Sequence, residues 1–134
     1  MVLVELLKDL VEELIESGIS SENIYFAGFS QGACLTAEFV SRNGQKYGGV
    51  AIFTGGLIGE KIRSKNYNGD FRSTPVFIGS GNPDAHVPVE RVKETQDLME
   101  RLNARVQVEI YNNRPHTISR EEIDRSNEMI FINK

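Results

Sequence analysis

The sequence predicts an α/β fold in which helices cover both faces of a parallel sheet. Segments with strand-like composition alternate along the chain with segments whose apolar residues recur at helical spacing. Three of the four strand-like segments are continuous apolar runs, which is typical of parallel strands that are buried on both faces. No repeat, low-complexity segment or linker divides the chain, so we expect a single domain over residues 1–134.

The first half of the chain predicts a helix, a strand, a second helix and a second strand. Residues 2–17 carry apolar side chains at helical spacing and are followed by Gly18, which is typical of an amphipathic helix and its end. The face that we expect this helix to bury comprises Leu3, Leu6, Leu7, Leu10, Leu14 and Ile15. Residues 24–28 form a short aromatic-rich run that predicts a strand buried on both faces. A helix is expected over about 31–41, and the apolar run 50–53 predicts the next strand.

The second half of the chain continues the alternation. Residues 55–74 are rich in glycine with scattered charges and predict a long loop that holds at most a helical turn. The apolar run 75–79 predicts a third buried strand, and a helix is expected over 88–103, where the opening proline suits the first turn. Strict alternation over 106–111 predicts a strand with one wetter face, near a sheet edge. Residues 119–122, Ser-Arg-Glu-Glu, form a capping box that opens a last helix.

The strand expected over 24–28 has the composition of a central strand but lacks a neighbour on one side. Among the expected strands, we assign it a partner only in the strand over 50–53. Its other edge is therefore expected to be free, and a free apolar edge is a template for strand addition. Two explanations stay open: an N-terminal segment of the fold is missing from this chain, or a second copy covers the edge.

Composition narrows the class of protein. The 134 residues are 40% hydrophobic and 25% charged, as in ordinary globular domains. The net charge of −4 argues against a nucleic-acid partner. The single cysteine, Cys34, excludes an internal disulfide framework and fits a reducing compartment. No apolar run approaches the length of a membrane span, and the N-terminus does not resemble a signal peptide, so we expect a soluble, cytoplasmic protein.

Residues 28–32, Gly-Phe-Ser-Gln-Gly, match the G-x-S-x-G pattern of a nucleophile elbow. In this motif a strand turns sharply into a helix and presents a serine hydroxyl at the strained tip. We expect Gly28 and Gly32 to avoid clashes between Cβ atoms and neighbouring elements at the turn. Because the pattern follows an expected strand and precedes an expected helix, it predicts an α/β-hydrolase with Ser30 as nucleophile.

A serine hydroxyl is a weak nucleophile until a base takes its proton, and the chain has two histidines. In α/β-hydrolases the chain order is nucleophile, acid, histidine. His116 directly follows the last expected strand, and Asp84 follows the strand before it, so they are the candidate base and its orienting acid. With Ser30 they all follow carboxyl ends of expected parallel strands, where open α/β sheets place their sites.

Plainer roles stay open for several of these residues. Asp84 has the alternative of a turn residue, and His116 that of a histidine in a surface loop. His86 precedes the last expected strand, so we expect it at the rim of the site or in a structural role rather than as the base. Cys34 is expected to be a small packing residue. The chain lacks Cys/His clusters at metal-ligand spacing, so no metal is expected.

These motifs resemble the phospholipase/carboxylesterase family, which includes acyl-protein thioesterases and small bacterial carboxylesterases. The residues that carry the resemblance are Gly28-Phe29-Ser30-Gln31-Gly32-Ala33, Asp84-Ala85-His86-Val87-Pro88 and His116-Thr117-Ile118. The resemblance implies hydrolysis of carboxylic esters or thioesters through an acyl-enzyme, without a cofactor. It also implies that Ser30, Asp84 and His116 form the catalytic triad, and that the backbone N–H of Gln31 is an oxyanion-hole donor.

The sequence departs from the family pattern in two respects. Asn82 stands where the family often has aspartate, and Ala85 replaces a proline. Family members are also longer and begin with several strands and a loop that supplies the second oxyanion donor, so the chain resembles the C-terminal portion of the fold. We therefore expect a serine esterase that acts on a small-molecule ester or acyl substrate. The alternative is a catalytically impaired fragment, or an interaction module, that retains the triad.

Overall fold

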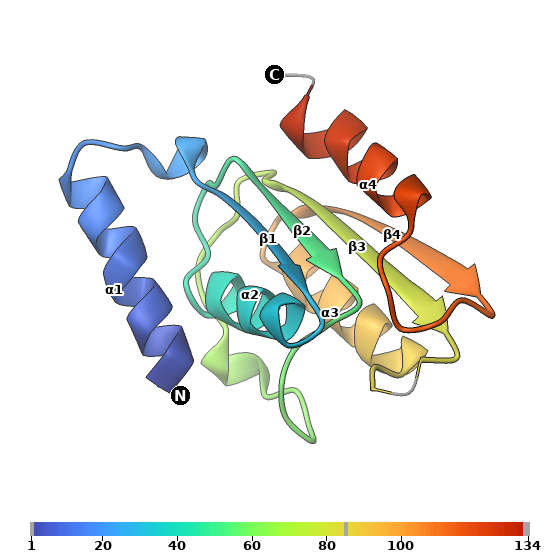
Figure 1. Ribbon diagram of the computed structural model, residues 1–134. Coiled ribbons are helices and arrows are strands. Elements are labelled where there is room, and N and C mark those ends of the chain that lie inside the picture. The colour runs from blue at the N-terminus through green and yellow to red at the C-terminus, as the bar shows by residue number, and fades with distance from the viewer. Residues whose placement is uncertain (1, 85, 133–134) are drawn as a thin grey trace.

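The computed structural model describes residues 2–84 and 86–132 of the chain. Within these residues four strands form one parallel sheet in the order β1-β2-β3-β4 (Figure 1). The strands are β1 (Tyr25–Phe29), β2 (Gly49–Phe53), β3 (Pro75–Asn82) and β4 (Arg105–Asn112). The predicted parallel sheet is confirmed, and every strand ends at the same edge, where the loops that matter for function gather.

Helices cover both faces of the sheet, as predicted (Figure 1). They are α1 (Val2–Glu16), α2 (Gln31–Arg42), α3 (Val89–Arg101) and α4 (Arg120–Ser126). On one face α2 packs on β1 and β2, α3 packs on β3 and β4, and α1 lies against α2. On the other face α4 leads into a π-helical turn, Asn127–Phe131, that packs on β2 and β3.

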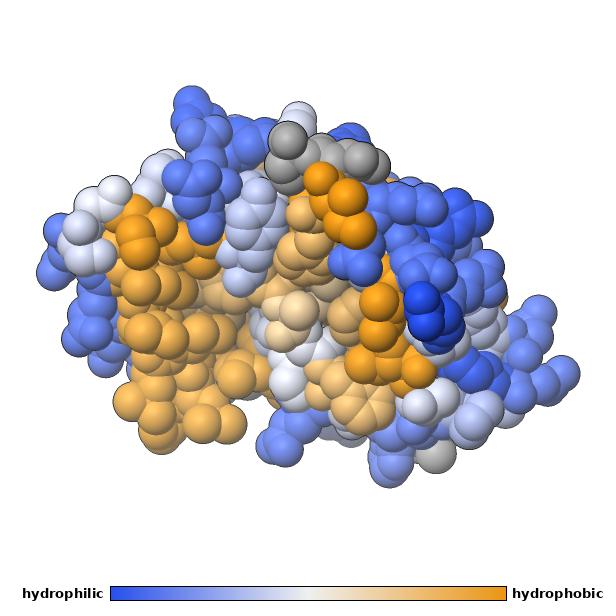
Figure 2. Space-filling model, turned by 45° about the horizontal axis from the view of Figure 1, so that its top comes forward, coloured by the Kyte–Doolittle hydropathy of each residue, from blue (hydrophilic) through white to orange (hydrophobic). Residues whose placement is uncertain are grey.

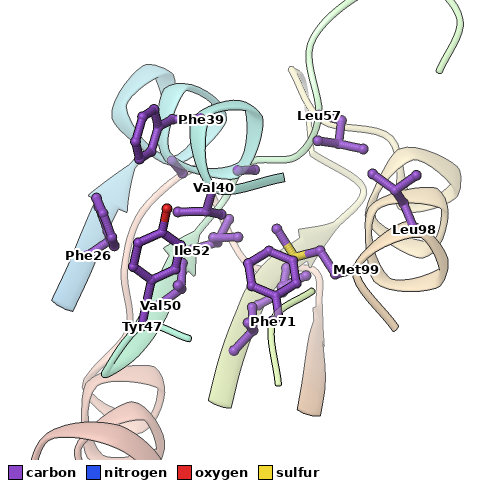
Figure 3. Packing of buried hydrophobic residues seen from close by; sticks show 14 of the residues in the cluster. Phe26, Phe39, Val40, Tyr47, Val50, Ile52, Leu57, Phe71, Leu98 and Met99 are labelled. Carbon is purple, nitrogen blue, oxygen red and sulfur yellow. The ribbon is translucent and has the colours of Figure 1, made fainter. Parts of the chain in front are cut away.

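Most buried apolar side chains belong to one cluster, which lies largely between the sheet and the helices α2 and α3 (Figure 3). The ring of Phe26 on β1 lies 5.7 Å from the ring of Phe39 on α2 and 5.1 Å from that of Tyr47. A smaller cluster on the opposite face comprises Ala51, Phe53, Phe77 and Ile130. Because fully burying one large apolar side chain stabilises the fold by about 1.5–3 kcal/mol, these two clusters fix β2 and β3 in the centre.

The burial of the four strands agrees with the prediction for three of them. β2 is buried along its whole length, β3 is buried except at its last residue, and β4 is a partly exposed edge strand. The prediction that β1 is buried on both faces is wrong, because Tyr25 and Phe29 are each 40% exposed. On this face of β1 the ring of Phe131 contacts Tyr25 and that of His116 contacts Phe29. No helix among the described residues covers the face.

Helix α1 buries a different stripe from the one predicted. Val4 and Val11 are buried, with Leu7 and Leu14 packed against the same core. The prediction that the neighbouring stripe is buried is wrong: Leu3, Leu6 and Leu10 are more than half exposed, and Ile15 is 38% exposed. The physical reason is that α1 packs on α2 along one line of side chains, while no described element covers the adjacent line. Figure 2 shows apolar residues gathered over α1, at the left of the molecule.

Local signals at helix ends agree with the structure in most cases. The capping box is confirmed: the Glu122 N–H donates to Ser119 Oγ, and the Ser119 N–H donates to the Glu122 carboxylate. The long loop after β2 contains one short 3-10 turn, Ser64–Asn66. Pro88 stands immediately before α3, as its N-cap residue, rather than within the first turn.

Candidate active site

Ser30 lies at the sharp junction between β1 and α2. Its backbone has φ 55° and ψ −114°, a conformation that residues other than glycine rarely adopt. The Ser30 N–H donates to the carbonyl of Phe53 at 3.0 Å, and the Ser30 carbonyl accepts from the N–H of Cys34 at 3.0 Å. The strained turn is thus held from β2 on one side and from α2 on the other.

The two glycines of the elbow differ in their surroundings. A Cβ on Gly28 would collide with the carbonyl of Gly32 and would lie 2.8 Å from the backbone nitrogen of Ala33. Strand and helix therefore approach too closely for any side chain at Gly28, as predicted. A Cβ on Gly32 would meet no described atom within 4 Å, so the prediction of a clash there is wrong within this chain.

The three side chains that the sequence singled out meet at the carboxyl edge of the sheet. Ser30 Oγ lies 2.9 Å from His116 Nε2, and His116 Nδ1 lies 2.9 Å from Asp84 Oδ2. The Asp84 side chain has no exposed surface, whereas that of His116 is 25% exposed. With its proton on Nδ1, the imidazole donates to the carboxylate and accepts from the serine hydroxyl, which is the geometry that proton transfer from serine requires.

The two carboxylate oxygens of Asp84 have different partners. Its Oδ1 accepts from the backbone N–H groups of His86 at 2.8 Å and Val87 at 2.9 Å, so it orders its own turn. Its Oδ2 faces His116. Burial favours the neutral acid, but the hydrogen bonds from His116 and from the two amides outweigh burial and lower the pKa of Asp84. The carboxylate is therefore charged at neutral pH.

The loop that carries His116 is anchored by a buried polar cluster that the sequence did not reveal. Arg114 pairs with Glu122 and donates to Thr54 Oγ1 at 3.2 Å, and that hydroxyl donates to the carbonyl of Thr117 at 3.3 Å. Glu122 is wholly buried and also closes the capping box with Ser119. In sequence Glu122 reads as an ordinary capping residue, so its pairing becomes visible only once the loop folds back onto the end of β2.

Two aromatic rings border His116. The ring of His86 lies 4.8 Å from that of His116 at an interplanar angle of 67°, and the ring of Phe29 lies 5.3 Å away. His86 is exposed and its ring packs edge-on against that of His116, so it lies at the rim of the site. Its backbone, through the bond to Asp84, is part of the turn that supports the carboxylate.

Comparison with known proteins decides the family. The sequence model of the Phospholipase/Carboxylesterase family matches residues 2–133. The chain belongs to this family. A crystal structure of a phospholipase/carboxylesterase from Dyadobacter fermentans is 54% identical and superposes with a TM-score of 0.91, over 93% of this chain and 60% of that chain. The α/β-hydrolase fold is confirmed by this match.

Two relatives of lower sequence identity are an acyl-protein thioesterase and a probable carboxylesterase. Acyl-protein thioesterase 1 from Kluyveromyces lactis is 35% identical over 101 residues, which are 72% of this chain and 43% of that protein. A probable carboxylesterase SOBER1-like protein from Arabidopsis thaliana is 28% identical over 114 residues, 85% of this chain and 44% of that protein. The chain spans about half the length of the curated relatives that it matches.

In this member of the phospholipase/carboxylesterase family, α2 begins directly after Ser30, so the N-terminus of the helix lies next to the serine. Gln31 is the first residue of α2 and directly follows Ser30. The first N–H groups of a helix have no acceptor within the helix, and they carry the positive end of its dipole. A negatively charged oxygen formed next to Ser30 is therefore favoured at this helix end, although the oxyanion role of Gln31 stays a prediction.

An apolar pocket of about 860 Å³ opens beside Gln31 and His86. Its size is in the range of small-molecule sites. Its walls come from the start of α1, from α2, from the loop after β2 and from α3: Val2, Leu3, Val4, Gln31, Cys34, Leu35, Gly56, Leu57, Ile58, Gly59, His86, Val87, Pro88, Glu90, Arg91 and Glu94. Cys34 is half-buried and borders this pocket, and its role as a packing residue stays a prediction.

Across 2–84 and 86–132, no group of three or more His, Cys, Asp or Glu side chains is placed to hold a metal ion. No helix in this part of the chain is long and apolar enough to cross a membrane.

Proposed function

We propose that this chain carries the hydrolytic site of a serine esterase, with Ser30 as nucleophile, His116 as base and Asp84 as its orienting acid. The observation that supports the proposal most strongly is the continuous chain of two 2.9 Å contacts from Ser30 Oγ through His116 to Asp84. Membership of the phospholipase/carboxylesterase family points to carboxylic esters or thioesters as the substrate class.

The proposed reaction has two halves. His116 Nε2 takes the proton of Ser30 Oγ as this oxygen attacks the carbonyl carbon of the ester, and the resulting tetrahedral oxyanion accepts from the Gln31 N–H. Collapse breaks the bond to the leaving alcohol or thiol, which receives the proton from His116 and leaves an acyl-enzyme on Ser30. Water then attacks this ester while His116 takes a proton from it, and as the carboxylic acid is released His116 returns that proton to Ser30 Oγ.

Asp84 supports both halves through its charge. Because its pKa is lowered, it stays ionised and stabilises the imidazolium that forms in each half. The apolar pocket beside Gln31 and His86 supports a substrate with an apolar acyl part, since a hydrocarbon chain would leave water on entering it.

The alternative function is a catalytically impaired chain that retains the triad. A specific observation favours it: the position of Gly32 and one face of β1 are open in the described chain, next to the site. In the family, the second oxyanion donor is expected from a loop that precedes this region. Loss of one such donor lowers turnover by roughly 10²–10³-fold, which would leave a reactive serine with weak activity.

Labelling by a fluorophosphonate probe, measured beside hydrolysis of p-nitrophenyl esters, distinguishes these functions. The probe needs an activated serine, whereas turnover needs the whole site. We expect both labelling and hydrolysis in the wild-type chain and neither in Ser30→Ala, with circular dichroism unchanged. Labelling without hydrolysis would favour the impaired chain. Absence of both in a folded protein would contradict the proposed triad.

A further inference from the structure

One wall of the apolar pocket is a loop without regular secondary structure. Its backbone groups are nevertheless hydrogen-bonded to side chains of neighbouring helices. This wall loop comprises residues 56–60, which follow β2. The N–H of Leu57 donates to Thr95 Oγ1 at 3.0 Å, and the N–H of Ile58 donates to Glu38 Oε1 at 3.0 Å. Side chains from α2 and α3 thus supply the partners that a strand or helix would supply to its own backbone.

Arg91 on α3 holds the carbonyl side of the wall loop. Its Nη1 donates to the carbonyls of Leu57 at 2.8 Å and Gly59 at 2.6 Å, and its Nη2 donates to the carbonyl of Glu60 at 3.0 Å. Its Nε donates to Glu94 at 3.0 Å, and the side chain is 19% exposed. The rigid fork of a guanidinium can reach three carbonyls at once, which a single ammonium group cannot do with the same geometry.

Glu38 gives the wall loop a second fixed point. It is wholly buried, and it accepts from Arg42 Nε at 2.6 Å and from the Tyr67 hydroxyl at 3.1 and 3.0 Å. A buried carboxylate is costly unless it is paired in this way. Burial, followed by the charge of Glu38, raises the pKa of Tyr67 to about 12, so the hydroxyl remains a donor. The acceptor for Ile58 is therefore held in place from two sides.

The wall loop also lies close against α3. A Cβ on Gly56 would come within 3.0 Å of Thr95 Oγ1 and 3.2 Å of Arg91 Cγ. Leu57 is buried, and together with Ile58 it borders the pocket. The width of the pocket therefore depends on how firmly the bonds to α2 and α3 hold this segment.

We propose that Arg91 is a positioning residue for substrate selection: by fixing the wall loop, it sets the size of apolar group that the pocket accepts. The inference rests on the proposed function in one respect, that the apolar acyl part of the ester lies in this pocket. It goes beyond that function because it assigns the preference for chain length to a residue that lies outside the triad and acts through the loop.

The test replaces Arg91 by methionine, which keeps an apolar stem along the pocket and removes the fork. The matched control is Arg101→Met, an exposed arginine in the last turn of the same helix. Arg91→Lys is the second variant, because it keeps the charge and should retain part of the contact if the methionine variant folds poorly. All three are compared with the wild type by circular dichroism.

Three measurements follow on each protein. Hydrogen exchange reports the amides of Leu57 and Ile58 directly, and we expect protection to fall at least tenfold in Arg91→Met, less in Arg91→Lys and not at all in Arg101→Met. The ratio of kcat/KM for the p-nitrophenyl octanoate and acetate esters is expected to fall at least fivefold in Arg91→Met, mainly through KM. Octanoate binding, measured by calorimetry, is expected to weaken by a similar factor.

The outcomes separate this inference from the proposed function. If the wild type binds octanoate but hydrolyses no ester, the triad proposal fails, and weaker octanoate binding by Arg91→Met still supports the role of Arg91. If the ester ratio and octanoate binding stay unchanged in Arg91→Met, the inference is overturned, whether or not exchange increases. It is equally overturned if the wild type does not bind octanoate and shows no preference between the two esters.

Discussion

At the scale of single residues, Ser30 combines chemistry with backbone strain. Its φ of 55° is in the left-handed region, which costs a residue other than glycine about 1–3 kcal/mol. The bonds to Phe53 and Cys34 hold that conformation in the folded state. The elbow motif indicated this strain from sequence, because the pattern requires a turn that presents the hydroxyl outward. The partners that hold the turn belong to β2 and α2 and could not be read from five residues.

Replacing Ser30 separates strain from activity. We expect Ser30→Ala and Ser30→Gly both to lose probe labelling and esterase activity, since neither has a nucleophilic oxygen. Ser30→Gly should be more stable than Ser30→Ala by about 1 kcal/mol, because glycine adopts positive φ without a steric penalty. Urea unfolding of the two variants measures the difference. Near wild-type activity in a pure Ser30→Ala preparation would refute the assignment of the nucleophile.

The two histidines should respond differently to substitution. We expect His116→Ala to lower kcat by roughly 10²–10⁴-fold, because it removes the base that lies 2.9 Å from Ser30 Oγ. His86→Ala should lower kcat much less, because its ring contacts His116 from the rim and its bond to Asp84 comes from the backbone. Steady-state kinetics on one ester compare them. Equal losses from both changes would show that His86 takes part directly.

The lowered pKa of Asp84 predicts a pH dependence of stability. A carboxyl group whose pKa is lower in the folded state than the ordinary value of about 3.9 stabilises the fold above that value. This contribution disappears as the pH falls through the lower, folded-state pKa. We therefore expect the difference in unfolding free energy between wild type and Asp84→Asn to shrink as the pH is lowered from about 5 to about 3. Urea titrations at these pH values test it, and a difference that grows toward acid would contradict the lowered pKa.

At the scale of elements, the sequence predicts strands better than it predicts which faces are covered. β2 and β3 are continuous apolar runs and are central, and the alternation of β4 correctly indicates an edge. β1 has the same kind of composition as β2, yet one of its faces is open, because coverage depends on segments that lie elsewhere in the chain. The predicted buried face of α1 is wrong for the same reason. The apolar spacing of this helix fits two neighbouring stripes, and packing on α2 selects one of them.

The sequence predicted the candidate catalytic residues, but it did not predict the contacts that hold the surrounding loops in place. The elbow motif, the chain order and the ends of parallel strands were sufficient to single out Ser30, Asp84 and His116, and the fold brings His116 within hydrogen-bonding distance of both other residues. Arg91 and Glu122 read as ordinary charged residues on helices. Their partners are backbone carbonyls and a partly buried arginine that lie next to them only in the folded chain. No periodic signal in the sequence marks such contacts.

The loop between β4 and α4 should depend on the buried pair of Arg114 and Glu122. We expect Glu122→Ala to lower the free energy of unfolding by about 3 kcal/mol, because it leaves the Arg114 charge, on a side chain only 10% exposed, without its partner. Glu121→Ala is the matched control, since Glu121 is exposed in the same turn, and it should change stability by less than about 0.5 kcal/mol. Urea unfolding measures both. Equal effects would show that the pair does not hold the loop.

At the scale of the whole molecule, one group of exposed apolar residues lies on α1 and on β1, the strand at one edge of the sheet. α1 lies on the side of the sheet where β1 forms the edge (Figure 1). The exposed stripe of Leu3, Leu6 and Leu10 is on that helix, and Tyr25 and Phe29 are partly exposed on β1. Monomeric proteins rarely expose large contiguous apolar patches. The β1 edge adds unpaired backbone groups within the described sheet, as expected for a strand that pairs only with β2. The expectation that the fold is N-terminally incomplete stays a prediction.

This surface predicts that the 134-residue chain associates in solution. Covering the leucine stripe and the β1 edge removes apolar area from water and pairs open backbone groups, and a second copy is the partner present in a pure sample. We expect sedimentation velocity at tens of micromolar to show dimers or larger species, and Leu6→Lys with Leu10→Glu to shift the chain toward monomer at no loss of stability. Ile123→Lys is the control, because Ile123 is similarly exposed but on α4, which lies on the other face of the sheet. A wild-type chain that is monomeric at 100 µM, and as active as one extended at its N-terminus, would contradict the argument, since the open surface would then need no partner.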